Sequence, residues 1–170
     1  ERRGWLVKPY ARSGVVNNWM STSAVSEIFW SESKSGVFRG MHLQLPPFAV
    51  SKTVFCISGE IIDFVLDLRT DSKTYLKSME IPISTSPNHA QGVIIPRGCA
   101  HGFLTTTDEA HVLYLQSGPR VEESECGVHF SSLRSKILSN ANQIIVSDRD
   151  ISLMSLDEFP PLTKAEWEIS

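Results

Sequence analysis

The run Ile61-Ile62-Asp63-Phe64-Val65-Leu66-Asp67-Leu68 alternates between two sets of side chains, as a β-strand does. Successive residues of a strand point to opposite faces of a sheet. The even-numbered residues of this run are all apolar, so they predict a face that belongs to the core. The odd-numbered residues mix apolar and acidic side chains and predict a second, mixed environment. Immediately before the run, Ser58-Gly59-Glu60 predicts a tight hairpin turn in which Gly59 supplies a positive φ.

Six further runs have the same short, apolar or alternating character and are separated by turn residues about every ten positions. They are Val37–Leu43, Lys52–Ile57, Tyr75–Ile81, Gly92–Ile95, His101–Thr105 and Ala110–Gln116. No helical period appears before Glu122, and Pro82 and Pro96 lie where turns or strand ends tolerate proline. Many short strands with almost no helix predict an all-β sandwich or small barrel.

The stretch Ile94–Phe103 makes the fold prediction more specific. Pro96-Arg97-Gly98 follows an apolar strand and forces a bend, and His101 then enters the next strand. This order is typical of the double-stranded β-helix, the cupin or jelly-roll fold. We expect one domain over residues 1–170, with a strand and loop region over 1–35, a jelly-roll core over 36–150 and a tail with short helical elements over 151–170.

Composition excludes several classes of function. With 170 residues and 19.0 kDa the chain has room for one domain with a sizeable core. Its net charge is −3 and its basic residues are scattered, so no surface for nucleic acid or for an anionic membrane is indicated. The three cysteines lack CxxC spacing, which favours a reducing compartment. The sequence shows neither an apolar membrane span nor a signal peptide, and we expect a cytoplasmic protein. Because it begins at Glu1 without methionine, we also expect the natural N-terminus to lie upstream.

The stretch Val37–Gln44 carries the densest chemistry, because it places a cation, an imidazole and an amide in one extended run. Strict alternation would put His42 and Gln44 on one face and point Arg39 away from them. A glycine within a strand often marks a bulge, and a bulge at Gly40 would turn Arg39 and His42 toward the same side. We therefore predict a bulge there.

Several motifs, in this order along the chain, together resemble the sugar-nucleotide 3,5-epimerase family over about residues 36–150. They are Gly36-Val37-Phe38-Arg39-Gly40-Met41-His42-x-Gln44, Lys52, Gly59–Arg69, Ile95–Phe103, Leu113-Tyr114, Glu122-x-x-Glu125-x-Gly127 and Val146–Asp150. The resemblance implies a jelly roll, normally a homodimer, that acts without metal or redox cofactor on a nucleoside-diphosphate 4-keto-6-deoxy sugar. The sugar is a hexose or a heptose, and C3, C5 or both are inverted.

The resemblance also implies a catalytic set. His42 stands where the family has its general base, and Asp150 stands where a carboxylate orients that base. Tyr114 matches the general acid. Lys52 and His101 match groups around the reacting oxygen. This set suits the chemistry, because a hydrogen next to a ketone is a weak acid and the enolate oxygen needs donors once the proton has left.

Five further residues match substrate-contact positions of the family. Arg39 matches a diphosphate ligand, Glu125 and Arg149 match further contacts, and Gln44 lies beside His42. Arg3 matches the start of a substrate-binding N-terminal strand.

The chain departs from the family at positions where the family recognises the nucleobase of the substrate. Glu27-Ile28-Phe29 replaces a Gln-Asp-Asn run, Pro119-Arg120 replaces an aromatic residue that stacks on thymine, and Lys8 replaces a carboxylate. From these departures we expect an active epimerase whose nucleotide is GDP or CDP rather than dTDP.

Three other readings remain open. His42, Gln44 and His101 would be ligands in a metal-dependent cupin, although one histidine and a glutamine leave the first motif short of ligands. A non-catalytic sugar-nucleotide binding protein would have no need for an acid and a base on opposite faces. A 3,4-ketoisomerase matches the motifs less well.

Overall fold

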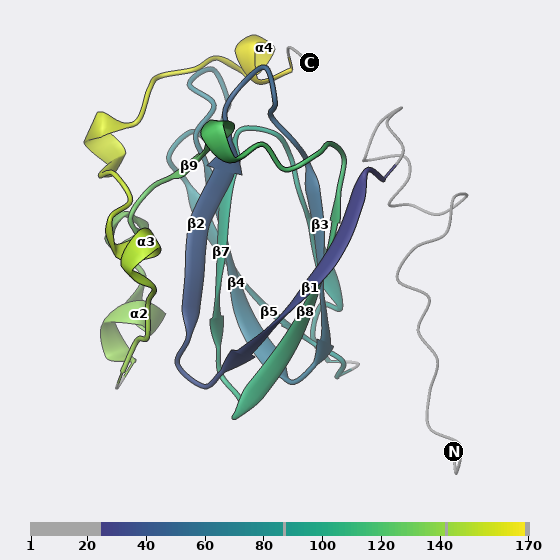
Figure 1. The fold of residues 1–170 in the computed structure, drawn as a ribbon. Helices are drawn as coiled ribbons and strands as arrows, with labels where there is room; N and C mark the ends of the chain where they lie inside the picture. Colours follow the sequence, from purple (N-terminus) through teal and green to yellow (C-terminus); the bar gives the residue numbers. More distant parts are fainter. Residues whose placement is uncertain (1–24, 87, 142, 169–170) are drawn as a thin grey trace.

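The computed structural model describes residues 25–86, 88–141 and 143–168, which form two antiparallel sheets flanked by short helices (Figure 1). One sheet has the strand order β1-β8-β3-β6, and the other has the order β5-β4-β7-β2-β9. The strands are β1 (Glu27–Lys34), β2 (Phe38–Gln44), β3 (Lys52–Ser58), β4 (Glu60–Asp67), β5 (Ser78–Ser84), β6 (Gly92–Ile95), β7 (Cys99–Thr105), β8 (Glu109–Gln116) and β9 (Glu125–Gly127). The all-β prediction is confirmed.

Short helices follow the last long strand and lie outside the sheet that contains β2 (Figure 1). They are η1 (Glu122–Ser124), η2 (Phe130–Leu133), α2 (Lys136–Asn140), α3 (Asp148–Ile151), η3 (Leu156–Glu158) and α4 (Lys164–Trp167). Within the described ranges, no helix has both the length and the apolar character needed to cross a membrane.

Strand β4 shows why the molecule has two separate cores. Ile61 belongs to a cluster between the two sheets, whereas Phe64 and Leu66 belong to a second cluster on the outer face of the five-stranded sheet. The C-terminal helices cover that outer face, and Trp167 of α4 is fully buried there. The predicted alternation is therefore correct. The mixed face points between the sheets, where it carries the buried carboxylate of Asp63.

The largest difference between a predicted run and the observed strand is at β5. The run predicted at Tyr75–Ile81 begins later, at Ser78, and includes Pro82. Proline is tolerated there because β5 lies at the edge of its sheet, where an N–H is not needed for a second neighbour. Strand β1 was not predicted, and the strand expected at Gly4–Val7 lies outside the described residues.

A bulge in β2 sets the direction of two site residues. The pairing with β7 joins Arg39 to Phe103 and His42 to His101, so two residues of β2 face one residue of β7 between these pairs. Gly40 occupies the bulge with φ +127°, and a Cβ there would lie 2.5 Å from Gly102 Cα. Only glycine fits this close approach. The predicted bulge is confirmed.

Candidate active site

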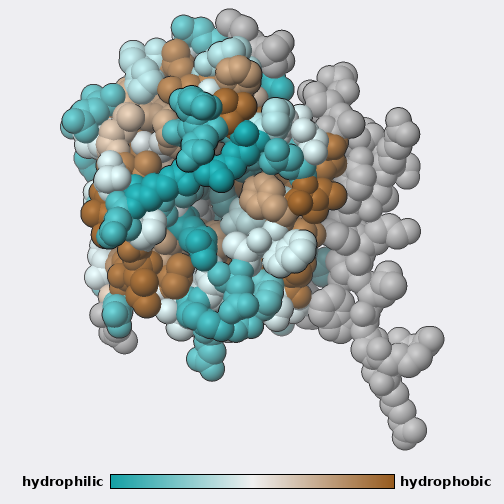
Figure 2. Space-filling view, viewed as in Figure 1, coloured by the Kyte–Doolittle hydropathy of each residue, from teal (hydrophilic) through white to brown (hydrophobic). Residues whose placement is uncertain are grey.

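A cavity of about 530 Å³ opens between the two sheets. In the space-filling view, hydrophilic side chains cross this face of the molecule beside a hollow (Figure 2). Nine of the ten predicted site residues line the cavity, and the tenth, Arg3, lies outside the described residues. The nine are Arg39, His42, Gln44, Lys52, His101, Tyr114, Glu125, Arg149 and Asp150. They come from both sheets and from α3.

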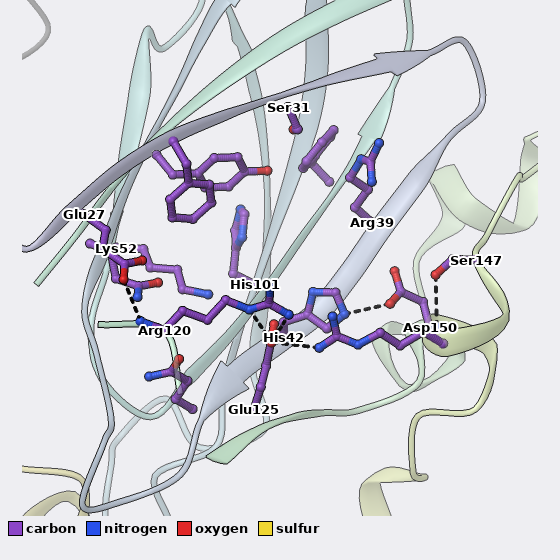
Figure 3. Close-up of a pocket in the computed structure, with 16 residues that line it drawn as sticks. Glu27, Ser31, Arg39, His42, Lys52, His101, Arg120, Glu125, Ser147 and Asp150 are labelled. Atoms are coloured by element: carbon purple, nitrogen blue, oxygen red, sulfur yellow. Dashed lines mark hydrogen bonds and ion pairs between the residues drawn. The ribbon is translucent and has the colours of Figure 1, made fainter. Parts of the chain in front are cut away.

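His42 and Asp150 form a hydrogen-bonded pair on one wall (Figure 3). His42 Nε2 lies 2.7 Å from Asp150 Oδ1, and the Gly40 backbone N–H donates to Asp150 Oδ2 at 3.1 Å. Helix α3 presents the carboxylate, and the Ser147 hydroxyl caps this helix by accepting from the Asp150 N–H. Burial raises the pKa of Asp150, but the bonds from His42 and Gly40 outweigh it and hold this pKa below its usual value. A carboxylate kept ionised orients the imidazole with Nε2–H toward it and leaves the lone pair on Nδ1.

Tyr114 lies on the opposite sheet, in the centre of β8. Its ring stacks on Phe29 of β1, with ring centroids 4.8 Å apart and planes inclined by 13°. Burial raises the pKa of the Tyr114 phenol far above its ordinary value of 10.0, and Arg39 counteracts this only in part. The phenol is therefore neutral at physiological pH and holds a proton to donate.

His101 and Asp63 form a second, deeper pair. His101 Nε2 lies 2.6 Å from Asp63 Oδ2, and both residues are buried. Burial raises the pKa of Asp63 above its ordinary value, and the charge and hydrogen bond of His101 offset this only in part. Asp63 Oδ1 is buried and accepts no hydrogen bond. Asp63 therefore fixes the orientation of the His101 ring at the floor of the cavity.

Lys52 brings an amine into the same space from the first residue of β3. Burial lowers its pKa from the ordinary 10.5, and Glu125 counteracts this in part. An ammonium with a lowered pKa is a stronger acid, so it donates a stronger hydrogen bond to an oxygen that gains negative charge.

A chain of charged groups spans the cavity mouth (Figure 3). Arg120 and Arg149 reach from opposite sides to the same oxygen of Glu125, at 2.7 and 2.9 Å. Burial raises the pKa of Glu125, but the two guanidinium groups outweigh it and hold this pKa below its usual value. Two cations share one anion, so these three side chains together carry an excess positive charge that can attract a diphosphate. The Glu27 carboxylate fixes the loop by accepting from the Arg120 backbone N–H at 3.1 Å.

Arg39 extends along the rim beside Tyr114. Its Nε donates to the Ser33 hydroxyl at 2.8 Å, and Nη2 donates to the Glu32 carbonyl at 3.0 Å. These bonds to β1 fix the guanidinium at the end of the cavity away from Glu125.

Gln44 lines the cavity, but its amide already holds the neighbouring loops. Nε2 donates to the carbonyls of Phe48 and Pro119, at 2.7 and 3.2 Å, and Oε1 accepts from the Val121 N–H at 2.9 Å. Both N–H groups are used in this way. These hydrogen bonds give Gln44 a role in positioning the loop that carries Arg120. Its predicted contact with the substrate stays a prediction.

The metal-dependent reading finds little support in this geometry. The imidazoles of His42 and His101 each donate to a separate carboxylate, and the Gln44 amide is engaged by backbone. Among the described residues, the group that could surround an ion is Glu32, Glu109 and His111, on the surface. The amine of Lys34 already pairs with both of its carboxylates.

Seven of the lining residues were not predicted as site residues, namely Glu27, Phe29, Ser31, Phe103, Gln116, Arg120 and Ser147. The first three lie on β1, whose cavity-facing side mixes polar and apolar residues and whose apolar Ile28 and Trp30 point outward and are exposed. This mixed pattern gives no strand signal. Arg120 stood out only as a departure from the family.

Residues 1–158 match the model of the family described as dTDP-4-dehydrorhamnose 3,5-epimerase. The chain belongs to this family. It is 34% identical to the dTDP-4-dehydrorhamnose 3,5-epimerase of Shigella flexneri over 122 residues, which are 72% of this chain and 66% of that protein. It is 32% identical to that of Sinorhizobium fredii over 160 residues, which are 94% and 76% of the two chains.

A solved structure agrees with these relatives. The dTDP-4-dehydrorhamnose 3,5-epimerase of Bacillus anthracis, with TDP and PPi bound, matches with a TM-score of 0.79 and 28% identity over 92% of this chain and 88% of that one. Membership in the dTDP-4-dehydrorhamnose 3,5-epimerase family confirms the predicted family, the predicted jelly-roll fold and the carbohydrate-epimerase class.

The prediction that GDP or CDP is favoured over dTDP is wrong. The relatives are named as dTDP-sugar enzymes, and the B. anthracis structure holds TDP. Of the replaced residues, Lys8 lies outside the described residues, and Glu27, Phe29 and Arg120 contact other groups of the protein. Phe29 stacks on Tyr114, Glu27 holds the Arg120 backbone, and Arg120 pairs with Glu125.

Proposed function

We propose that this chain inverts C3, C5 or both of a dTDP-linked 4-keto-6-deoxy sugar, by taking a proton next to the ketone and returning one on the other face. One observation carries the proposal. The His42–Asp150 pair and the Tyr114 phenol line the same cavity from opposite sheets. Inversion needs a base and an acid on the two faces of one planar enolate, and two facing walls supply that arrangement.

His42 removes the proton. Its Nδ1 lone pair accepts the hydrogen on the carbon beside the ketone while Nε2–H remains bonded to Asp150. The imidazolium that forms is stabilised by this ionised carboxylate, as in other catalytic imidazole–carboxylate pairs. Asp150 thereby fixes both the tautomer and the angle of the ring.

The electron pair of the broken C–H bond moves to the ketone oxygen, and Lys52 and His101 stabilise it there. Both side chains line the cavity, Lys52 from β3 and His101 from β7. A single well-placed donor to such an oxygen typically contributes about 10²–10³-fold in rate. The lowered pKa of Lys52 strengthens this donation.

Tyr114 returns a proton to the carbon from the opposite face. The C–H bond forms as the phenol O–H breaks, and the ketone is restored. Arg120 and Arg149 at the mouth hold the diphosphate and so orient the sugar between the two walls, and Arg39 offers a further cation at the other end of the cavity. Exchange with solvent then removes the added proton from His42 and returns a proton to the Tyr114 phenolate.

We further propose a homodimer in the cytoplasm. On β1, Ile28 and Trp30 are 61% and 71% exposed, and a second copy would cover them. The three cysteines are unpaired, as thiols in a reducing compartment are. Light scattering of the purified chain tests the oligomeric state, and a monomeric mass at micromolar concentration would contradict the dimer.

The activity is tested by incubating the purified protein with dTDP-4-keto-6-deoxyglucose and following the sugar ring couplings by proton NMR. We expect signals of a sugar inverted at C3, C5 or both, and no such signals with the Tyr114→Phe variant. An unchanged sugar after prolonged incubation with the wild-type protein would overturn the proposed reaction.

A further inference from the structure

Phe29 occupies a specific place next to the proposed acid. Antiparallel pairing of β1 and β8 puts Phe29 directly opposite Tyr114, and pairing of β3 and β8 puts Val54 on its other side. The three side chains form a row across one face of the four-stranded sheet. The Tyr114 ring is thus placed between an aromatic face and a β-branched side chain.

The contact with Phe29 is a well-formed stack. The two rings are nearly parallel, 4.8 Å apart, and the His101 ring approaches Tyr114 edge-on at 6.3 Å and 78°. Parallel, closely spaced rings hold each other's plane, because tilting either ring breaks the contact. The Tyr114 ring is therefore restrained from swinging about its Cα–Cβ bond, the rotation that would move the phenol oxygen, while Phe29 itself is 37% exposed at the cavity rim.

This restraint bears on one step of the reaction. After His42 has taken the proton, the enolate can receive a proton again from His42, which restores the starting sugar. It can instead receive one from Tyr114, which inverts the carbon. In the second case the enolate electron pair forms the new C–H bond, the phenol O–H breaks and a phenolate remains. The ratio of the two outcomes depends on how often the phenol oxygen lies within reach of the carbon.

We infer that Phe29 is a positioning residue for Tyr114, and that its stacked ring sets the fraction of enolates that are inverted rather than returned to the starting configuration. This inference rests on the proposed function. Phe29 neither donates nor accepts a proton, so its effect is confined to the partition between the two outcomes. Abstraction by His42 takes place on the opposite sheet and does not involve it.

The experiment compares two rates in deuterium oxide with dTDP-4-keto-6-deoxyglucose. The first is the total rate of deuterium entry beside the ketone, in inverted and uninverted sugar together. The second is the rate of inversion. The variants are Phe29→Leu, which removes the ring, and Phe29→Tyr, which keeps it. Phe29→Met is a second ring-free variant in case Phe29→Leu folds poorly, and circular dichroism checks that each is folded.

We expect Phe29→Leu and Phe29→Met to lower the ratio of inversion to total exchange by roughly three- to tenfold, the scale of one lost aromatic contact. Phe29→Tyr should restore the wild-type ratio, and Tyr114→Phe should exchange with almost no inversion. A ratio that stays at the wild-type value in folded Phe29→Leu and Phe29→Met would overturn the inference while leaving the proposed function intact. Wild-type protein that neither exchanges nor inverts would overturn both.

Discussion

His42 Nε2 lies 2.7 Å from Asp150 Oδ1, although 108 residues separate the two along the chain. The bulge at Gly40 and the capped start of α3 bring them together, and the Gly40 N–H donates to the other oxygen of the same carboxylate. One backbone feature therefore serves both partners, because it turns the imidazole into the cavity and fixes the carboxylate behind it.

Replacing Asp150 with asparagine should remove most of the activity without unfolding the protein. The amide keeps the size of the carboxylate but carries no charge to stabilise the imidazolium, and it favours the wrong tautomer of His42. We expect kcat to fall about 10²–10⁴-fold with little change in KM, as in comparable pairs. Steady-state kinetics measure this. A fall of less than threefold would show that Asp150 does not orient the base.

Lys52→Met should separate activity from stability. The loss of an oxygen-stabilising donor should lower kcat about 10²–10³-fold. Burial lowers the pKa of Lys52 in the folded protein below the 10.5 of an unfolded chain. Between these two pKa values the unfolded chain binds more protons, so wild-type stability rises with pH there, and below the folded pKa the charged amine destabilises the fold. The variant should therefore melt at a higher temperature than wild type near neutral pH.

The pH dependence of Lys52→Met stability checks whether the charged amine destabilises the fold. The difference in melting temperature between Lys52→Met and wild type should shrink as the pH approaches 10.5. Calorimetric melts across this range measure it. A variant that melts well below the wild type at neutral pH would mean that the charged amine stabilises the fold through its attraction to Glu125.

Gly40→Ala should damage both fold and site. A Cβ at this position would lie 2.5 Å from Gly102 Cα and 2.7 Å from the His101 carbonyl oxygen, and the residue has φ +127°. We expect the free energy of unfolding to fall by about 2–4 kcal/mol, from strain and backbone displacement together. Urea unfolding measures this change. Wild-type stability would mean that β2 can hold the two site residues without its bulge.

Arg120→Ala should change substrate binding more than stability. The Arg120 side chain is 52% exposed, and an exposed ion pair contributes about 0–1 kcal/mol to folding. A guanidinium that contacts the diphosphate lowers KM, so we expect KM to rise roughly three- to thirtyfold with kcat nearly unchanged. Lys136→Ala, on the exposed surface of α2, is the matched control. A change confined to kcat would place Arg120 in the chemical step instead.

The sequence predicts the centre of the fold well, because there the side-chain pattern and the environment agree. The alternation in β4 separates two real cores, and Gly59 takes the positive φ that its hairpin requires. Strand β1 escapes prediction because its side toward the water-accessible cavity mixes Glu27 and Ser31 with Phe29, while Ile28 and Trp30 face outward. Such a strand has no apolar face toward a core, and periodicity cannot reveal it.

The site residues themselves could be predicted from the sequence, whereas their hydrogen-bond partners mostly could not. The motifs bring nine residues into one cavity, and two of these, His42 and His101, follow a bulge or bend that glycine or proline marks in the sequence. The partners of these residues were harder to foresee. Asp63 appeared as one of two acidic residues on a mixed strand face, and nothing local indicated that it holds His101. The incorrect nucleotide prediction arose because altered residues were taken as evidence for another base, whereas Phe29 stacks on Tyr114 and Arg120 pairs with Glu125.

Exchange of solvent deuterium tests the central claim most directly. Wild-type protein and His42→Ala are incubated with dTDP-4-keto-6-deoxyglucose in deuterium oxide, and label at C3 and C5 is followed by NMR. If His42 is the base, the wild type introduces deuterium at every inverted centre and the variant introduces almost none. Inversion by the wild type without label from solvent, or labelling by His42→Ala at the wild-type rate, would contradict the account.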